Sequence, residues 1–219
     1  MDRLKWGNSM GVIKHKQPIL VFQNSGQQDE GLSSTLQQPT SNLTKGVGEQ
    51  KITSNCDPLT GLLCRSAFEI NRLNKGFERD LAAAIIIDFD RFTDVNEKYG
   101  RAVGDFILAI QAERLLKNDV ARERIIYRYE GDRFLELVFS KNGVDEIVLM
   151  QVARDLQQNL CQPIKMKQSD VVISCCIGLA LKDESKNAAQ LATEALLAVE
   201  EAKQIGTGNI YLSELSTAD

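Results

Sequence analysis

The sequence predicts an α+β fold in which a central mixed sheet is flanked by helices. Residues 81–89 form a nearly unbroken apolar run, which is typical of a strand buried in the middle of a sheet. Along the chain, helical and strand patterns follow in the order helix, strand, helix, strand, strand, helix, strand, helix, strand. Such an order favours a mixed sheet with helices packed against it.

Turn residues and apolar spacing predict the first elements. Asp57-Pro58-Leu59-Thr60-Gly61-Leu62 indicates a turn that leads into a helix ending near residue 73. The buried strand follows and closes with Asp88-Phe89-Asp90. Two glycines then interrupt the chain ahead of a helix expected over roughly 105–118.

A β-hairpin is predicted in the middle of the chain. Two strand-like runs, over 125–129 and 134–139, are separated by Glu130-Gly131-Asp132-Arg133, which is typical hairpin turn chemistry. The remaining elements are a helix over about 144–160, a strand over 171–180, a helix over roughly 187–204 and a short strand over 209–212.

Composition limits the class of protein. The 219 residues are 43% hydrophobic and 26% charged, as in soluble globular proteins. The formal net charge is -4, whereas nucleic-acid-binding domains usually carry an excess of basic residues. No apolar run approaches the roughly 18 residues needed to cross a bilayer, and the first residues lack a secretory signal. We therefore expect a cytoplasmic protein that binds no nucleic acid and inserts into no membrane.

The N-terminal part differs from the rest in composition. Residues 1–52 are rich in Gln, Ser, Asn, Gly and Thr and offer too little apolar surface to offset the chain entropy lost on folding. We predict a polar, disordered tail over 1–52 and one domain over 53–215. The five cysteines show no C-x-x-C spacing and His15 is the only histidine, so a zinc site is not expected.

Two aspartates occupy positions suited to phosphoryl-transfer chemistry. Asp88 ends the buried strand, and Asp132 lies in the turn of the hairpin. Two carboxylates that converge on magnesium ions can clamp a triphosphate and activate an attacking hydroxyl. Taken singly, each is better explained as a solvated residue at a strand end or in a turn.

Separated segments resemble, in order, the motifs of the GGDEF (diguanylate cyclase) family. They are Asp57–Leu62 with Arg65, Asp88–Phe92 with Asn96, Tyr99-Gly100 with Gly104-Asp105, Arg128–Phe134, Ser174–Gly178 and Ala202–Gly206. Each motif is weak alone, but the ordered set is specific. It implies a nucleotidyl-cyclase-like sheet over about residues 57–212.

The resemblance implies a reaction in which two GTP-loaded domains, face to face, form cyclic dimeric GMP and release pyrophosphate. Asp88, the Phe89 carbonyl and Asp132 would bind Mg²⁺ once nucleotide is bound. Asp132 and Lys203 are the candidate catalytic residues if the domain is active.

The resemblance also assigns residues to the nucleotide. Asn96 and Asp105 would read the guanine edges, Gly131 would lie against the nucleotide, and Lys203 would neutralise the terminal phosphates. Three of these four residues also have a plainer structural interpretation. Asn96 would shape the loop before Gly100, Asp105 would cap the following helix, and Lys203 would complement the negative end of its helix.

Four departures from the family pattern oppose catalysis. Glu130 replaces the first signature glycine and brings a negative charge next to a polyanion. Arg133 replaces the signature glutamate, Thr93 replaces a lysine, and Thr207-Gly208 displaces the arginine expected after Gly206. Phosphoryl transfer depends on positioning and charge neutralisation, so these losses predict a degenerate domain.

The inhibitory product site of the family, R-x-x-D, is also missing. The matching stretch is Ala121-Arg122-Glu123-Arg124, whose two arginines are expected to be solvated residues leading into the strand. Three functions stay open at this stage. They are a non-catalytic regulatory or protein-binding module that retains GTP, an active diguanylate cyclase, and a purely structural interaction domain. A protein partner and a homodimer are both expected assemblies.

Overall fold

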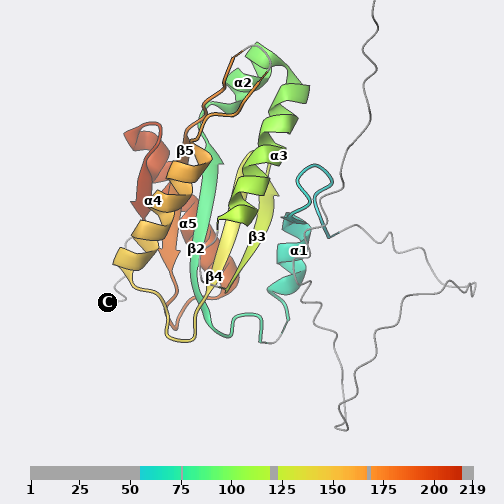
Figure 1. Cartoon of the computed structure of the whole chain (residues 1–219). Coiled ribbons are helices and arrows are strands. Elements are labelled where there is room, and N and C mark those ends of the chain that lie inside the picture. Colours follow the sequence, from blue (N-terminus) through green and yellow to red (C-terminus); the bar gives the residue numbers. More distant parts are fainter. Residues whose placement is uncertain (1–54, 75, 119–122, 167–168, 214–219) are drawn as a thin grey trace, which may run out of the picture. The chain divides into compact units, whose positions relative to one another are not determined.

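A computed structural model describes residues 55–74, 76–118, 123–166 and 169–213 (Figure 1). The tail predicted over 1–52 lies outside these residues. The helices are α1 (Arg65–Asn71), α2 (Phe92–Tyr99), α3 (Arg101–Lys117), α4 (Glu146–Leu160) and α5 (Ala188–Ile205). The strands are β1 (Leu63–Cys64), β2 (Leu81–Phe89), β3 (Glu123–Glu130), β4 (Arg133–Phe139), β5 (Cys175–Leu181) and β6 (Ile210–Leu212).

The strands form one mixed sheet in the order β1-β3-β4-β2-β5-β6. The central strand, β2, pairs antiparallel with β4 on one side and with β5 on the other. The two outer pairs, β1 with β3 and β5 with β6, are parallel. All nine residues of β2 are buried, which confirms the strand predicted from the apolar run.

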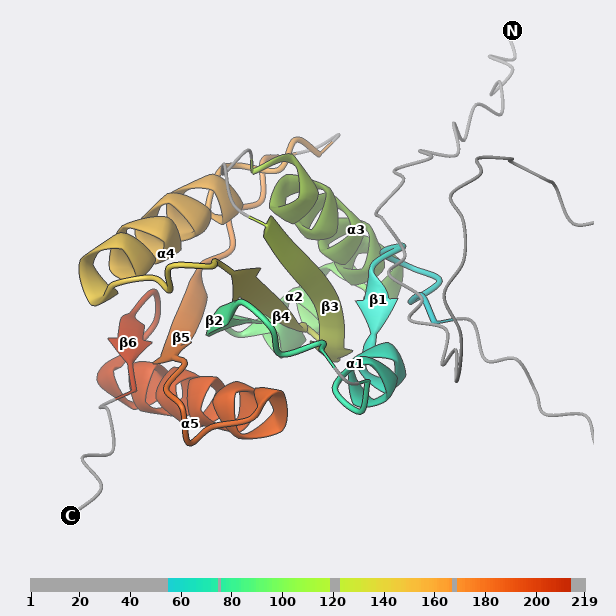
Figure 2. The same cartoon turned by 90° about the horizontal axis from the view of Figure 1, so that it is seen from below.

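Helices cover both faces of this sheet, as Figure 2 shows. Alternate residues of β2 point to opposite faces, so Ile85 and Ile87 belong to one core and Ile86 to the other. The first core includes residues of α3 and α4, and the second includes residues of α1 and α5. Each fully buried isoleucine contributes about 1.5–3 kcal/mol to the free energy of unfolding.

Helix α5 approaches β5 very closely, and Gly178 makes this possible. A Cβ atom at this position would lie 2.1 Å from the Ala195 carbonyl oxygen and 2.3 Å from the Val199 amide nitrogen. The capping box formed by Asn187 and Gln190 fixes the start of the same helix. The start of α5 is therefore fixed by its cap, and its middle packs directly on β5.

The predicted helix over 105–118 starts earlier than expected. Gly100 adopts φ +86°, which ends α2, and α3 begins at Arg101. Asp105 lies inside this helix, so its predicted role as N-cap is wrong. The strand expected over 171–180 is also shorter, because Val171 pairs with Ile164 in an isolated bridge and β5 begins only at Cys175.

Candidate functional site

A cleft of about 450 Å³ opens where the end of β2, the β3–β4 turn and the end of α5 meet. Its lining contains five of the residues predicted to form the site, together with charged neighbours. The lining residues are Asp88, Phe89, Arg91, Phe92, Thr93, Glu130, Gly131, Asp132, Arg133 and Lys203.

The β3–β4 hairpin is the predicted one, and its register places the turn beside Asp88. Gly131 and Asp132 form a two-residue connection, in which Gly131 adopts φ +56°. Arg133 pairs with Glu130 across the hairpin and with Asp88 across the β2–β4 ladder. The altered signature residue therefore lies directly opposite the predicted metal ligand.

Both carboxylate oxygens of Asp88 are engaged by cations. Arg133 Nε donates to Asp88 Oδ2 at 2.5 Å, and Lys203 Nζ lies 2.5 Å from Asp88 Oδ1. Only 2% of the Asp88 side chain is exposed. Two fixed cations thus neutralise a nearly buried carboxylate, which would be costly to bury alone.

Arg133 is held from a second side by a residue that sequence reasoning missed. Its Nη2 donates to Glu200 Oε1 at 2.6 Å. Glu200 precedes Lys203 by three residues on α5, a spacing that puts both on one face of the helix. This spacing could have linked Glu200 to the predicted site residue Lys203. The sequence alone, however, does not show which strand this face of α5 contacts.

Asp132 is the second predicted metal carboxylate, and it has a different environment. Burial, and then the nearby charge of Asp88, raise the pKa of Asp132 above its ordinary value. The charged form is therefore less stable in the folded protein than in the unfolded chain.

Replacing this carboxylate with its neutral amide should stabilise the protein. We expect Asp132→Asn to raise the melting temperature at pH 7 by a few degrees. Because the folded-state pKa is raised, the unfavourable contribution is absent below the unfolded pKa and grows as pH rises through the folded one. The difference between variant and parent should therefore shrink toward about pH 4. Calorimetry across this range tests it, and an unchanged or lower melting temperature at pH 7 would contradict the assignment.

Glu130, the other altered signature residue, is turned toward α1. Its Oε2 lies 3.3 Å from Arg65 Nη1, and 66% of its side chain is exposed. Exposed ion pairs of this kind contribute about 0–1 kcal/mol. Glu130 therefore adds charge to the rim of the cleft and little to the stability of the hairpin.

Two motif residues hold the hairpin turn from outside the cleft. Arg128 Nη1 donates to both oxygens of Asp57, at 2.9 and 3.0 Å, and Arg128 Nε donates to the Gly131 carbonyl at 2.9 Å. Asp57 also accepts the amide of Thr60 at 2.8 Å. The entry motif thus has a structural role, because it ties the start of the domain to the signature turn.

Asp90 also stabilises structure at the end of β2. Its carboxylate accepts hydrogen bonds from Ser174 Oγ at 2.6 Å, from the Gly208 amide at 2.9 Å and from Cys176 Sγ at 3.2 Å. The Thr207-Gly208 insertion, which departs from the family pattern, is therefore anchored to β2 through its backbone.

The residues predicted to read guanine lie away from this cleft lining. Asn96 is on α2 and packs against α3, where a Cβ atom on Gly104 would lie 1.9 Å from Asn96 Oδ1. Asp105 is exposed on α3. Neither residue lines the cleft. Their roles in guanine recognition stay predictions.

One expectation for a solvated arginine was wrong. Arg124 is half-buried, lies 3.3 Å from the fully buried Glu136, and donates to the carbonyls of Leu115 and Asn118 at the end of α3. It neutralises a core carboxylate and caps a helix. Arg122, the other arginine of this stretch, lies outside the described residues.

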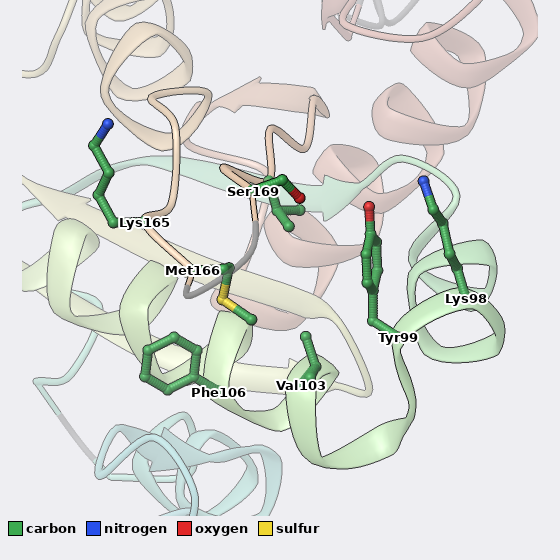
Figure 3. A pocket seen from close by; sticks show the side chains of 8 residues that line it. Lys98, Tyr99, Val103, Phe106, Lys165, Met166 and Ser169 are labelled. Carbon is green, nitrogen blue, oxygen red and sulfur yellow. The ribbon is translucent and has the colours of Figure 1, made fainter.

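A second cavity, of about 560 Å³, lies between α2, α3 and the segment before β5 (Figure 3). Its walls are mainly apolar and include Tyr99, Val103, Phe106 and Met166. Among the described residues, none of those that line this cavity carries a carboxylate.

The donor set at Asp88 does not fit Mg²⁺. A magnesium ion requires oxygen ligands at 2.0–2.1 Å in octahedral geometry. Asp88 has no oxygen that is not already in contact with a cation. Among the described residues, no group of three histidine, cysteine or acidic side chains could hold a metal ion.

Within the same described part of the chain, no helix is long and apolar enough to span a membrane.

Comparisons with known proteins agree with the motif analysis. Residues 54–209 match the family described as "Diguanylate cyclase, GGDEF domain". Diguanylate cyclase TpbB of Pseudomonas aeruginosa is 31% identical over 168 residues, which cover 73% of this chain and 38% of that protein. Diguanylate cyclase DgcN of Escherichia coli is 32% identical over 139 residues, which cover 62% of this chain and 33% of that protein. The chain therefore spans well under half the length of these curated relatives.

Solved structures show the same fold. The GGDEF domain of TpbB from P. aeruginosa superposes with a TM-score of 0.63 at 29% identity, over 73% of this chain and 95% of that one. The GGDEF domain of DgcB from Caulobacter crescentus, solved in complex with c-di-GMP, gives a TM-score of 0.65 at 18% identity, over 78% of this chain and all of that one.

Proposed function

Since the chain belongs to the diguanylate cyclase GGDEF domain family, we propose that it is a non-catalytic member that retains GTP binding. It acts as a regulatory or protein-binding module in bacterial cyclic di-GMP signalling. The observation that carries this proposal is the double ion pair of Asp88 with Arg133 and Lys203.

These ion pairs support the proposed loss of catalysis. In phosphoryl transfer between two nucleotides, positive charge must neutralise the oxygens of the transferred phosphoryl group, and the attacking hydroxyl must be activated. Arg133 holds Asp88 from the place of the family's glutamate, and it also binds Glu200. Asp88, one of the two predicted metal carboxylates, is thus paired with a guanidinium that Glu200 holds from its other side.

Retention of GTP is supported by the cleft itself. Its volume of about 450 Å³ falls in the range of small-molecule sites, and Arg91, Arg133 and Lys203 line it. These side chains can contact phosphate oxygens without any bond being made or broken.

A protein partner is the second proposed ligand. Leu197 and Ile205 are 62% and 65% exposed on α5, the helix that also carries Glu200 and Lys203. An apolar contact on this helix would couple a partner to the cleft through one rigid element. Homodimerisation through the same helix is the other proposed assembly.

The cyclase assay tests the proposal directly. We expect purified protein with GTP and Mg²⁺ to form no cyclic dimeric GMP, as measured by chromatography of the reaction mixture. The matched control is Glu130→Gly with Arg133→Glu, which restores the family signature and should produce detectable product.

Formation of cyclic dimeric GMP by the unmodified protein would contradict the proposal. If that product disappears in Asp88→Ala, the protein is an active diguanylate cyclase. Thermal stabilisation by saturating GTP separates the remaining alternatives, because a ligand of the native state raises its stability by mass action. A melting temperature unchanged by GTP would leave a purely structural interaction domain.

A further inference from the structure

The charge arrangement in the cleft points to nucleotide binding without a metal ion. Resting on the proposed retention of GTP, we infer that the Arg133 guanidinium takes the place of the divalent cation. The polyphosphate of GTP is then bound by Arg133 and Lys203 directly, and Mg²⁺ is not required.

The first support is charge balance among the residues that line the cleft. Three acidic side chains face three basic ones. They are Asp88, Glu130 and Asp132 against Arg91, Arg133 and Lys203. With the family's glutamate at position 133, four acidic groups would face two basic ones, a net charge of -2 (2 − 4). A divalent cation would cancel that charge, and the arginine removes the same two negative charges permanently.

The second support is the fixed position of the guanidinium. Arg133 comes from β4 directly opposite Asp88, and Glu200 of α5 holds its other side. Only 27% of its side chain is exposed. An arginine held in this way loses little conformational entropy when it binds a ligand.

The third support is the number of donors that remain. A guanidinium has five N–H donors, and an ammonium group has three. In the described part of the chain, Arg133 uses one donor on Asp88 and one on Glu200, and Lys203 uses one on Asp88. Three N–H groups of Arg133 and two of Lys203 are left. They can donate charge-assisted hydrogen bonds to phosphate oxygens.

A magnesium ion would have to break this arrangement to bind. It would displace Arg133 and Lys203 from a carboxylate that is 2% exposed, and both cations would then repel it. GTP without a metal ion meets no such competition. The site is therefore expected to be indifferent to Mg²⁺.

The test is GTP binding by calorimetry with the full chain, once in excess EDTA and once in excess Mg²⁺. We expect dissociation constants that agree within about threefold. Arg133→Glu should weaken binding in EDTA by at least tenfold and recover in Mg²⁺. Arg79→Glu, an equal charge reversal at an exposed residue outside the cleft lining, should bind as the parent does in both buffers.

The outcomes separate this inference from the function on which it rests. Binding by the parent that needs Mg²⁺ overturns the inference and leaves GTP retention intact. Absence of binding in both buffers overturns GTP retention as well. If Arg133→Glu does not fold, the parent's two titrations still decide the matter, and Arg133→Gln supplies a neutral variant that should bind less tightly in EDTA.

Discussion

Gly178→Ala should lower the free energy of unfolding by about 3 kcal/mol, at the upper end of the usual cost of overpacking a core. The added Cβ would lie 2.1 Å from the Ala195 carbonyl oxygen, 2.3 Å from the Val199 amide nitrogen and 2.8 Å from the Val199 Cα. All three are backbone atoms of α5, so no rotamer change can relieve the contact. The helix must move away from β5. Urea denaturation measures the loss.

Gly104→Ala is the matched control, because it adds the same methyl group at another buried glycine. There the nearest atoms are Asn96 Oδ1 at 1.9 Å and Asn96 Cγ at 3.0 Å, which belong to a side chain that can rotate. We expect a cost of about 1 kcal/mol. Equal losses in the two variants would show that the approach of α5 to β5 is not the constraint we describe.

The same substitution should also affect the cleft. Glu200 and Lys203 lie on α5 beyond the point of closest approach, so a displaced helix carries both away from Asp88 and Arg133. GTP-dependent stabilisation should therefore fall in Gly178→Ala. In Gly104→Ala it should change only if Asn96 contacts the nucleotide, which tests that prediction separately.

Much of the fold could be predicted because local patterns and burial agree. The length of the apolar run over β2 suits a buried strand, which is what forms. The Gly131-Asp132 turn suits a β-hairpin, which also forms. The start of α3 was placed too late because Gly104 was interpreted as a loop residue. Its real role is to let α2 pack closely, as the contact with Asn96 shows.

The site was predicted less completely. Motif order identified Asp88, Asp132 and Lys203, and all three line one cleft. The partners of Arg133 could not be predicted, since they depend on strand register and on the placement of α5. From the sequence alone, Arg133 in place of the signature glutamate indicates the loss of an acidic group from the metal site. In the structure Arg133 forms ion pairs with two acidic residues, Asp88 and Glu200.

Asp88→Ala should destabilise this protein by about 2–3 kcal/mol. The substitution leaves Arg133 and Lys203, which are 27% and 32% exposed, close together without their shared counter-charge. Removal of one partner from a buried ion pair usually costs about 3–5 kcal/mol, and partial exposure of the two cations reduces that figure. Denaturant unfolding of the two proteins measures the difference.

A double-mutant cycle shows whether the charge network is the cause. Asp88→Ala in an Arg133→Ala background should cost at least about 1 kcal/mol less than in the parent, because one of the two stranded cations is gone. Additive losses would mean that Asp88 and Arg133 are not coupled, and that Asp88 stabilises the fold through its pair with Lys203 or through packing. The sign of the single substitution is also informative. A carboxylate kept only to bind a metal would be a burden in the metal-free protein, and its removal would stabilise the fold, as we expect for Asp132→Asn. We therefore expect opposite signs at Asp88, which pairs with Arg133 and Lys203, and at Asp132, whose charged form is destabilised by burial and by the charge of Asp88.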